Sequence, residues 1–267
     1  MPLVKAICTN CGAALEVDNT KDAAICPYCG AAYIVEKAIH NYNITNNYTT
    51  TNNITANAVK IYNNNSNSGE SDFVIEAGSL IRYRGASSEA VIPDGVTRIA
   101  PYAFSGCAGL KSVVIPDSVV EIGKRAFEGC VGIENIEFPV SVTDIGPHAL
   151  AGCVGLVELT IPTKVEYISE SMCDGCTSLI KVNFNQGLVG IGMRAFRGCT
   201  ALESIVFPAS VTDIDPYAFE SCIKLTELTI PDSMKQVGFR AFIGCPVQTI
   251  HATNAWKKEH HSQISSL

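Results

Sequence analysis

Apolar and polar residues along most of this chain follow one pattern that repeats every 23 residues. In the period that starts at Pro116, the apolar positions are Val119, Ile122, Ala126, Phe127, Cys130, Ile133, Ile136 and Phe138, and the next period begins at Pro139. Ile136 and Phe138 are two residues apart, which predicts a short strand that the proline ends. Val119 and Ile122 predict a second inward-facing segment. The run from Gly123 to Cys130 predicts a turn followed by a helical or 3-10 corner.

The regular step of cysteine and proline indicates that each period is one coil of a solenoid. Cysteine recurs at Cys107, Cys130, Cys153, Cys176, Cys199, Cys222 and Cys245, and proline at Pro93, Pro116, Pro139, Pro162, Pro208 and Pro231, with Asn185 where another is expected. Such periods mark stacked units that bury a shared core. We therefore predict a β-rich solenoid with a parallel sheet. Its interior should hold a stack of Phe104, Phe127, Phe196, Phe219 and Phe242, with Leu150 and Cys173 replacing Phe in two coils.

The cysteines of the repeat are expected to be small, buried, reduced thiols. Equivalent side chains on stacked strands lie about 4.8 Å apart, whereas a disulfide needs its two Cβ atoms about 3.8 Å apart. Redox sensing and additional metal binding are the alternatives. Cys173 and Cys176 form a further C-x2-C pair, but the repeat places Cys173 at a core position.

Four other cysteines, near the N-terminus, have the spacing of a metal site. Cys8 and Cys11 form one C-x2-C pair and Cys26 and Cys29 form another, and a glycine follows each pair. Four thiolates held on two tight turns suit one tetrahedral Zn²⁺ ion. A rubredoxin-like iron site is the alternative. A segment of this size buries too little surface to fold unaided, so the ion is expected at least to hold the fold together.

Residues 41–70 are rich in Asn and Thr and differ in composition from both flanking regions. Asn-Ile-Thr occurs twice, at Asn43–Thr45 and Asn53–Thr55, and Asn63–Gly69 is typical of a linker. Two interpretations stay open here. One is a disordered linker, and the other is a short β stalk that associates with a second copy through residues 41–62.

Charge and hydropathy exclude several functional classes. The net charge of −7 argues against non-specific binding to nucleic acid. No segment has about 18 continuous apolar residues, and the first eight residues lack the apolar core of a signal peptide, so we expect no membrane contact and a cytoplasmic location. The five histidines are scattered and no catalytic motif is present, so we do not expect an enzyme.

The repeat resembles BspA-like leucine-rich repeats. Their pattern Val-x-x-Ile-Gly-x-x-Ala-Phe-x-x-Cys-x-x-Leu-x-x-Val-x-Ile-Pro recurs over about residues 73 to 252, and the N-terminal cysteine pairs resemble a zinc ribbon. The resemblance implies a zinc ribbon over 1–40 and a right-handed leucine-rich-repeat solenoid with an N-terminal hairpin cap over 71–252. By composition, residues 41–70 between them are the linker or short β stalk, and residues 253–267 are a C-terminal cap or tail. It also implies surfaces that bind other proteins.

Two surfaces of the predicted solenoid are candidates for partner binding. The first is the outer side of the sheet, where variable positions hold Asn135, Glu137, Glu158, Lys181, Asn183, Ser204 and Glu227. The second is the corner after the repeated glycine, with the pairs Pro101-Tyr102, Lys124-Arg125, Pro147-His148, Met193-Arg194, Pro216-Tyr217 and Phe239-Arg240. The first is equally consistent with a solvated face, whereas the second is better explained as the convex corner of each coil.

Two functions follow from these features. The first is a non-enzymatic protein-interaction scaffold with a structural zinc head. The alternative is a zinc-ribbon regulator that contacts nucleic acid and uses the solenoid as a sensor or oligomerisation domain.

Overall fold

The computed structural model describes residues 3–7, 14–18, 23–25, 32–34 and 72–259. The chain divides into two units, Met1–Tyr62 and Asn63–Leu267, and each is described by itself. The segment 41–70, its predicted self-association region 41–62 and the tail beyond residue 259 lie outside the described residues.

Four short strands in the N-terminal unit form two antiparallel pairs. β1 (Leu3–Ile7) pairs with β2 (Ala14–Asp18), and β3 (Ala23–Ile25) pairs with β4 (Ala32–Ile34). The partners nearest the first connection are Ile7 and Ala14, and those nearest the second are Ile25 and Ala32. Each pair is therefore joined by a connection of the same sequence length.

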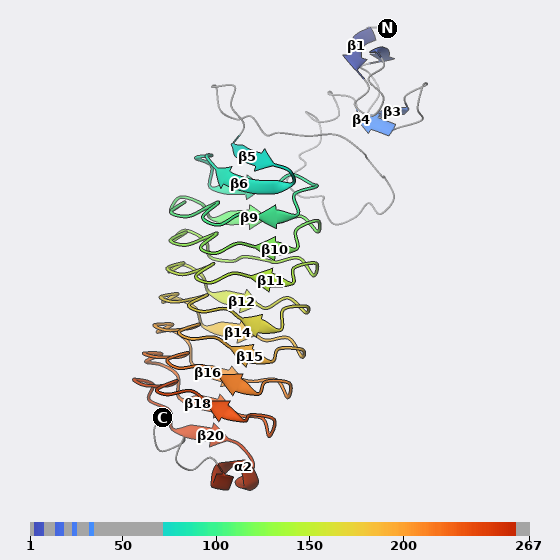
Figure 1. Cartoon of the computed structure of the whole chain (residues 1–267). Coiled ribbons are helices and arrows are strands. Elements are labelled where there is room, and N and C mark those ends of the chain that lie inside the picture. Colours follow the sequence, from blue (N-terminus) through green and yellow to red (C-terminus); the bar gives the residue numbers. More distant parts are fainter. Residues whose placement is uncertain (1–2, 8–13, 19–22, 26–31, 35–71, 260–267) are drawn as a thin grey trace. The chain divides into compact units, whose positions relative to one another are not determined.

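The second unit is a β-solenoid of about eight parallel turns (Figure 1). One side of the coils carries the three-residue strands β7 (Glu89–Val91), β9 (Ser112–Val114), β12 (Glu158–Thr160), β14 (Lys181–Asn183), β16 (Ser204–Val206), β18 (Glu227–Thr229) and β20 (Thr249–His251). The other carries the two-residue strands β8 (Arg98–Ile99), β10 (Glu121–Ile122), β11 (Asp144–Ile145), β13 (Tyr167–Ile168), β15 (Gly190–Ile191), β17 (Asp213–Ile214) and β19 (Gln236–Val237). Most adjacent strands pair with a 23-residue offset, as in Leu159 with Val182 and Ile168 with Ile191. The predicted parallel stacking is confirmed.

The core follows the apolar pattern of the repeat. The predicted stack of phenylalanines forms in two blocks, with ring centroids 4.9 Å apart for Phe104 and Phe127 and 5.1 Å apart for Phe219 and Phe242. Leu150 and Cys173 lie between the blocks and are fully buried. Because aromatic rings at this spacing gain attraction beyond their buried area, each block ties neighbouring coils together.

The prediction that the corners are helical or 3-10 is wrong for the described coils. The corner residues form turns, and each corner has two residues with left-handed backbone conformation. The first is Tyr102, Arg125, His148, Ser171, Arg194, Tyr217 or Arg240, and the second is Gly106, Gly129, Gly152, Gly175, Gly198, Ser221 or Gly244. Left-handed residues interrupt a right-handed helix, so no helical turn propagates.

Backbone hydrogen bonds explain why the corner adopts this conformation. Along one corner, alternate N–H groups donate to the next coil, from Tyr102 to Lys124, Phe104 to Ala126 and Gly106 to Glu128, at 2.7–3.0 Å. The intervening N–H groups donate within the coil, from Ala103 to Ala100, Ser105 to Tyr102 and Cys107 to Phe104. A helix would use all of these donors within one coil, whereas the alternating turn also joins coil to coil.

Each end of the solenoid has an element outside the repeat. At the N-terminal end, β5 (Phe73–Glu76) and β6 (Ser79–Tyr83) form an antiparallel hairpin that pairs with β8 through β6. At the other end is the short helix α2 (Asn254–Glu259). Its Trp256 is buried, and the indole Nε1 donates to the carbonyl oxygen of Met234 at 2.8 Å. Apolar side chains of the terminal coils are covered in this way.

Candidate interaction surface

The outer side of the three-residue strands, which we call the strand face, is built by simple alternation. The middle residue of each strand points into the core, as Leu159 does, and the residues on either side point outward. Of the predicted partner-binding residues, Asn135, Glu137, Glu158, Lys181, Ser204 and Glu227 are exposed and Asn183 is half-buried. All seven therefore lie on the strand face, and their binding role stays a prediction.

Some polar side chains of the strand face already form hydrogen bonds and ion pairs with the neighbouring coil. Glu158 Oε1 accepts hydrogen bonds from Asn183 Nδ2 at 2.7 Å and Lys181 Nζ at 3.0 Å. The hydrogen bond from Asn183, followed by the Lys181 ammonium, lowers the pKa of Glu158. Further along, His251 Nε2 lies 2.8 Å from Glu227 Oε1. Glu158 and Lys181 are directly opposite on paired strands, and Asn183 and His251 reach the carboxylates of the neighbouring strands diagonally.

The sheet on the strand face is not continuous. Its strands form the separate groups β7–β9, β12–β14 and β16–β18–β20. In the coil between β9 and β12, residues 134–138 form no strand. On this face they are joined to the next coil by an isolated bridge from Asn135 to Glu158 and by a hydrogen bond from the Val157 N–H to the carbonyl oxygen of Glu134 at 3.0 Å. A parallel ladder would otherwise bond this coil to both neighbours. This coil is therefore the most loosely paired part of the strand face.

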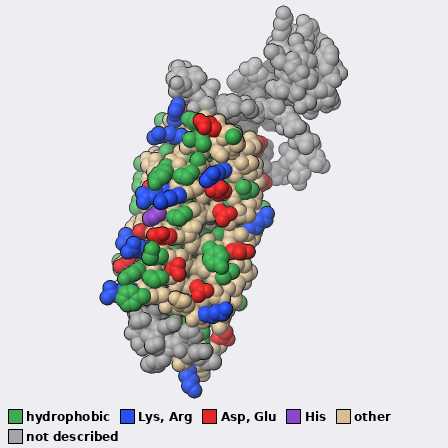
Figure 2. Space-filling view, viewed as in Figure 1, with side chains coloured by type: hydrophobic (Ala, Val, Ile, Leu, Met, Phe, Trp, Pro, Cys, Tyr) green, Lys and Arg blue, Asp and Glu red, His purple; other side chains and the backbone are tan. Residues whose placement is uncertain are grey.

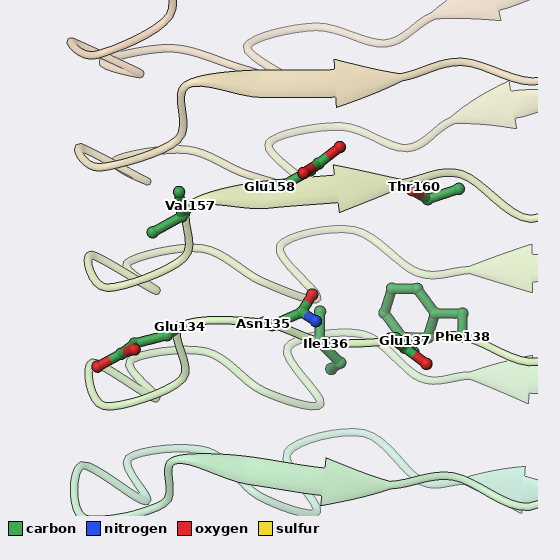
Figure 3. Close-up of a pocket in the computed structure, with 8 residues that line it drawn as sticks. All are labelled: Glu134, Asn135, Ile136, Glu137, Phe138, Val157, Glu158 and Thr160. Carbon is green, nitrogen blue, oxygen red and sulfur yellow. The ribbon is translucent and has the colours of Figure 1, made fainter.

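A groove of about 580 Å³ lies at this interruption. It is lined by Glu134, Asn135, Ile136, Glu137, Phe138, Val157, Glu158 and Thr160. Figure 3 shows these side chains on two neighbouring coils, with Glu158 and Thr160 on β12 and the segment 134–138 on the adjacent coil. The volume is in the range of pockets that bind small-molecule ligands in proteins.

The groove carries three carboxylates and a single amide among its polar side chains. Glu134 and Glu137 are exposed, and neither forms an ion pair with any described residue. Glu158 is the third carboxylate, and Lys181 is its only ion-pair partner in the described part of the chain. The groove therefore has a net negative charge, and Phe138 and Val157 give it apolar surface as well. This combination suits a ligand that carries both cationic and apolar groups.

Sequence reasoning identified part of this groove. Asn135, Glu137 and Glu158 belong to the predicted binding residues, whereas Glu134 and Val157 do not. These two share one repeat position just before the strand, which holds Lys111, Glu134, Val157, Ile180, Glu203 and Thr226 in successive coils. The variability of this position was the available signal, because positions that only pack the core stay apolar.

The second predicted surface, the corner ridge, consists of the left-handed residues and their preceding neighbours. Arg125 lies over the Tyr102 ring at 5.9 Å, Arg194 over Tyr217 at 5.6 Å and Arg240 over Phe239 at 4.9 Å. Figure 2 shows basic, acidic and apolar side chains interspersed over the visible face of the solenoid. Much of the ridge is thus engaged in contacts with itself, which favours a stabilising role.

The prediction that the repeat cysteines are buried, reduced thiols is confirmed for five of the seven. Cys130, Cys153, Cys176, Cys199 and Cys222 are fully buried, Cys107 and Cys245 at the two ends are half-buried, and all are reduced. Burial raises the pKa of Cys130 to about 12. A thiol that stays protonated is a poor nucleophile and a poor metal ligand.

The predicted zinc ligands Cys8, Cys11, Cys26 and Cys29 lie outside the described residues. Within the described part of the chain, no group of three or more metal-binding side chains is present. The same residues contain no helix long and apolar enough to cross a membrane.

Comparisons with known proteins agree with the repeat. The family profile of the BspA type leucine rich repeat region matches six copies over residues 83–203 and 189–263. A leucine-rich repeat protein from Eubacterium ventriosum ATCC 27560 is 30% identical, with a TM-score of 0.61, over 67% of this chain and 48% of that one. This chain thus spans about half of that protein's length.

Two further solved structures are similar at lower TM-scores. The T. pallidum leucine rich repeat protein is 26% identical over 69% of this chain and 86% of its own, with a TM-score of 0.46. A leucine rich cell surface protein from Faecalibacterium prausnitzii A2-165 is 23% identical over 68% of this chain and 74% of its own, with a TM-score of 0.48. A search of curated proteins finds no match.

Proposed function

The chain belongs to the BspA-type leucine-rich repeat family, and on that premise we propose that it is a non-enzymatic protein-interaction scaffold whose strand face binds a partner protein. Solenoids expose long surfaces of variable residues on a conserved core, and such surfaces serve as binding sites. The groove between the 134–138 segment and β12 is the observation that carries the proposal. It combines spare carboxylates, exposed apolar surface and an interrupted ladder at one place.

The interior of the solenoid supports an external rather than an internal site. Side chains of the core, including both blocks of stacked phenylalanines, fill the space between the two strand rows and are fully buried. Binding must therefore use outward residues, and on the strand face these change from coil to coil. The predicted cytoplasmic location stays a prediction.

The proposal is tested by binding measurements on the full chain. Short random peptides displayed on phage are selected against it, and the affinities of the selected peptides are measured by calorimetry. A strand-face variant with Asn135→Tyr and Thr160→Tyr should bind them at least tenfold more weakly, since both residues are exposed and line the groove, and the larger uncharged side chains fill it.

The matched control changes the corner ridge instead. Arg194→Ser and Tyr217→Ser remove a ridge contact of the same solenoid and should leave the affinities unchanged. Binding that is lost in the ridge variant and retained in the strand-face variant contradicts the proposal.

We further propose that the N-terminal unit holds one Zn²⁺ ion through Cys8, Cys11, Cys26 and Cys29. The chemistry of four thiolates in two C-x2-C pairs fits zinc. The strand pairing is compatible with it, because Cys8 and Cys11 belong to the connection between β1 and β2, and Cys26 and Cys29 to that between β3 and β4. When bound, the ion supplies folding free energy to strands too short to be stable alone.

Native mass spectrometry with metal analysis of the full chain tests this second proposal. We expect one zinc ion per chain and its loss in a Cys8→Ser, Cys29→Ser variant. The control is Cys173→Ser, Cys176→Ser, which alters the buried C-x2-C pair of the solenoid and should retain the ion. A chain that binds no metal, or that binds iron, contradicts it. Salt-sensitive binding of DNA or RNA by the full chain would instead favour the alternative function, a zinc-ribbon regulator that contacts nucleic acid.

A further inference from the structure

We propose that the groove on the strand face takes an extended segment of a partner protein that carries Lys or Arg next to apolar side chains. This inference rests on the proposed scaffold function and specifies the chemistry of its partner.

The first argument is charge. Glu134 and Glu137 flank Asn135 and lack cationic partners within the described chain, and Glu158 lies across the groove on β12. The groove thus brings two carboxylates without a cationic partner among the described residues together with a third, Glu158, that is paired with Lys181. Lys and Arg side chains of a partner supply the missing positive charge at the solvent-exposed rim of the groove.

The second argument is the apolar surface next to the carboxylates. Val131, Val154, Val157 and Ile180 have 42%, 39%, 41% and 49% of their surface exposed. Val131 and Val154 occupy one repeat position on adjacent coils, as Val157 and Ile180 do. Val157 also lines the groove. Val157 in the groove, and Ile180 on the next coil, whose N–H donates to the Val157 carbonyl oxygen at 2.9 Å, suit a segment that is both cationic and apolar, whereas a purely polar one would leave this apolar surface in water.

The third argument concerns the backbone. Regular stacking would bond residues 135–137 to β9 on one side and β12 on the other. Toward β12, the Asn135 to Glu158 bridge and the hydrogen bond from the Val157 N–H to the Glu134 carbonyl oxygen remain, whereas toward β9 the described strands show no pairing. The coil therefore keeps backbone groups on its β9 side that no described strand uses. An extended segment presents its own N–H and C=O groups along its length, whereas a helix has already bonded them.

The experiment uses the same random peptides selected against the full chain. The inference predicts that bound peptides are enriched in Lys or Arg next to apolar residues. Their affinity should fall about tenfold in a Glu134→Gln, Glu137→Gln variant, which keeps the size of both side chains and removes two charges. Added salt should weaken binding to the natural chain more than to this variant, because salt screens exposed charges.

Glu203 supplies the matched control. It occupies the same repeat position as Glu134, three repeats further along, and is also exposed. Glu203→Gln should leave the affinity unchanged. Equal losses in both variants, or selected peptides that are acidic or neutral, overturn the inference.

The two proposals fail in different ways. If binding depends on Asn135 and Thr160 but not on Glu134 and Glu137, the strand face is the binding surface and only the cationic partner is wrong. If no selected peptide depends on any of these residues, the scaffold function proposed for the strand face is itself contradicted. Circular dichroism of each variant checks that the solenoid remains folded.

Discussion

From Cys130 to Cys245, each repeat cysteine links two coils through its thiol. The Sγ of Cys153 donates to the carbonyl oxygen of Phe127 at 3.2 Å, and the same oxygen accepts the backbone N–H of Cys130 at 3.2 Å. Equivalent thiol contacts run from Cys130 to Cys245 at 3.0–3.3 Å. Cysteine suits this position because it packs as a small apolar group and still offers a weak donor.

The buried thiols predict a loss of stability in alkali. The pKa of Cys130 is about 12 in the folded chain, against an ordinary value of 9.0, because burial disfavours the thiolate. The unfolded chain therefore binds fewer protons between these values. Stability is fully present below pH 9.0 and falls as the pH rises towards about 12, by up to about 1.4 kcal/mol per pH unit for one such thiol.

Urea unfolding at a series of pH values measures this effect. Cys130→Ala should be less stable at neutral pH but should depend less on pH above 9.0. A natural chain whose stability does not change across this range would contradict the burial of the thiols.

Some glycines are required because the backbone of the preceding coil lies where a side chain would stand. A Cβ on Gly132 would lie 2.7 Å from the carbonyl oxygen of Ala108, and 2.8 Å from that of Leu110. Gly109 has the same repeat position one coil earlier, and a Cβ there would meet nothing within 4 Å. Gly132→Ala should therefore cost about 1–3 kcal/mol, and Gly109→Ala should have little effect.

Chemical denaturation of both variants checks this pair. Equal midpoints for Gly132→Ala and Gly109→Ala would show that the coils are not packed as closely as described.

At the scale of the element, the corner depends on residues that tolerate a positive φ. Arg194 has φ 55° and is exposed, and its guanidinium lies over Tyr217. Asn is favoured in this conformation, and β-branched residues are strongly disfavoured. Arg194→Val should be less stable than Arg194→Asn by about 1–2 kcal/mol, although both lose the contact with the ring. Thermal unfolding of the two variants measures the difference, and equal stabilities would argue for a helical corner.

Strands and core could be predicted from sequence, but the corner could not. The inward positions of the strands follow from a period of two, and the Phe stack from the repeat itself, so both depend on local pattern. The run from Ala126 to Cys130 has apolar spacing that fits a helical turn as well as the alternating turn. The choice is made by hydrogen bonds to the next coil, which the pattern within a single coil does not specify.

The groove was only partly predictable for a related reason. The outward direction of Asn135, Glu137 and Glu158 follows from alternation. The interruption of the sheet beside them depends on how two coils pair, and no residue in the segment 134–138 signals it. Glu134 and Val157 line the groove although the Val157 N–H still donates to the carbonyl oxygen of Glu134 at 3.0 Å, a contact between coils that the pattern within one coil does not specify.

On the scale of the whole solenoid, a uniform core supports a surface that varies from coil to coil. Hydrogen bonds, stacked rings and thiol contacts repeat with the 23-residue period, whereas the outward residues of the strand face do not. A binding site on such a scaffold is expected where several variable positions adjoin, and the groove meets this condition.

Hydrogen–deuterium exchange of the full chain with and without a selected peptide tests the central claim most directly, because it locates the binding surface without any substitution. The account predicts that the peptide slows amide exchange in residues 134–138 and 157–160, which line the groove, and leaves the corner residues 101–106 unchanged. Slower exchange confined to the corners or to the N-terminal unit, with the groove unaffected, would contradict it.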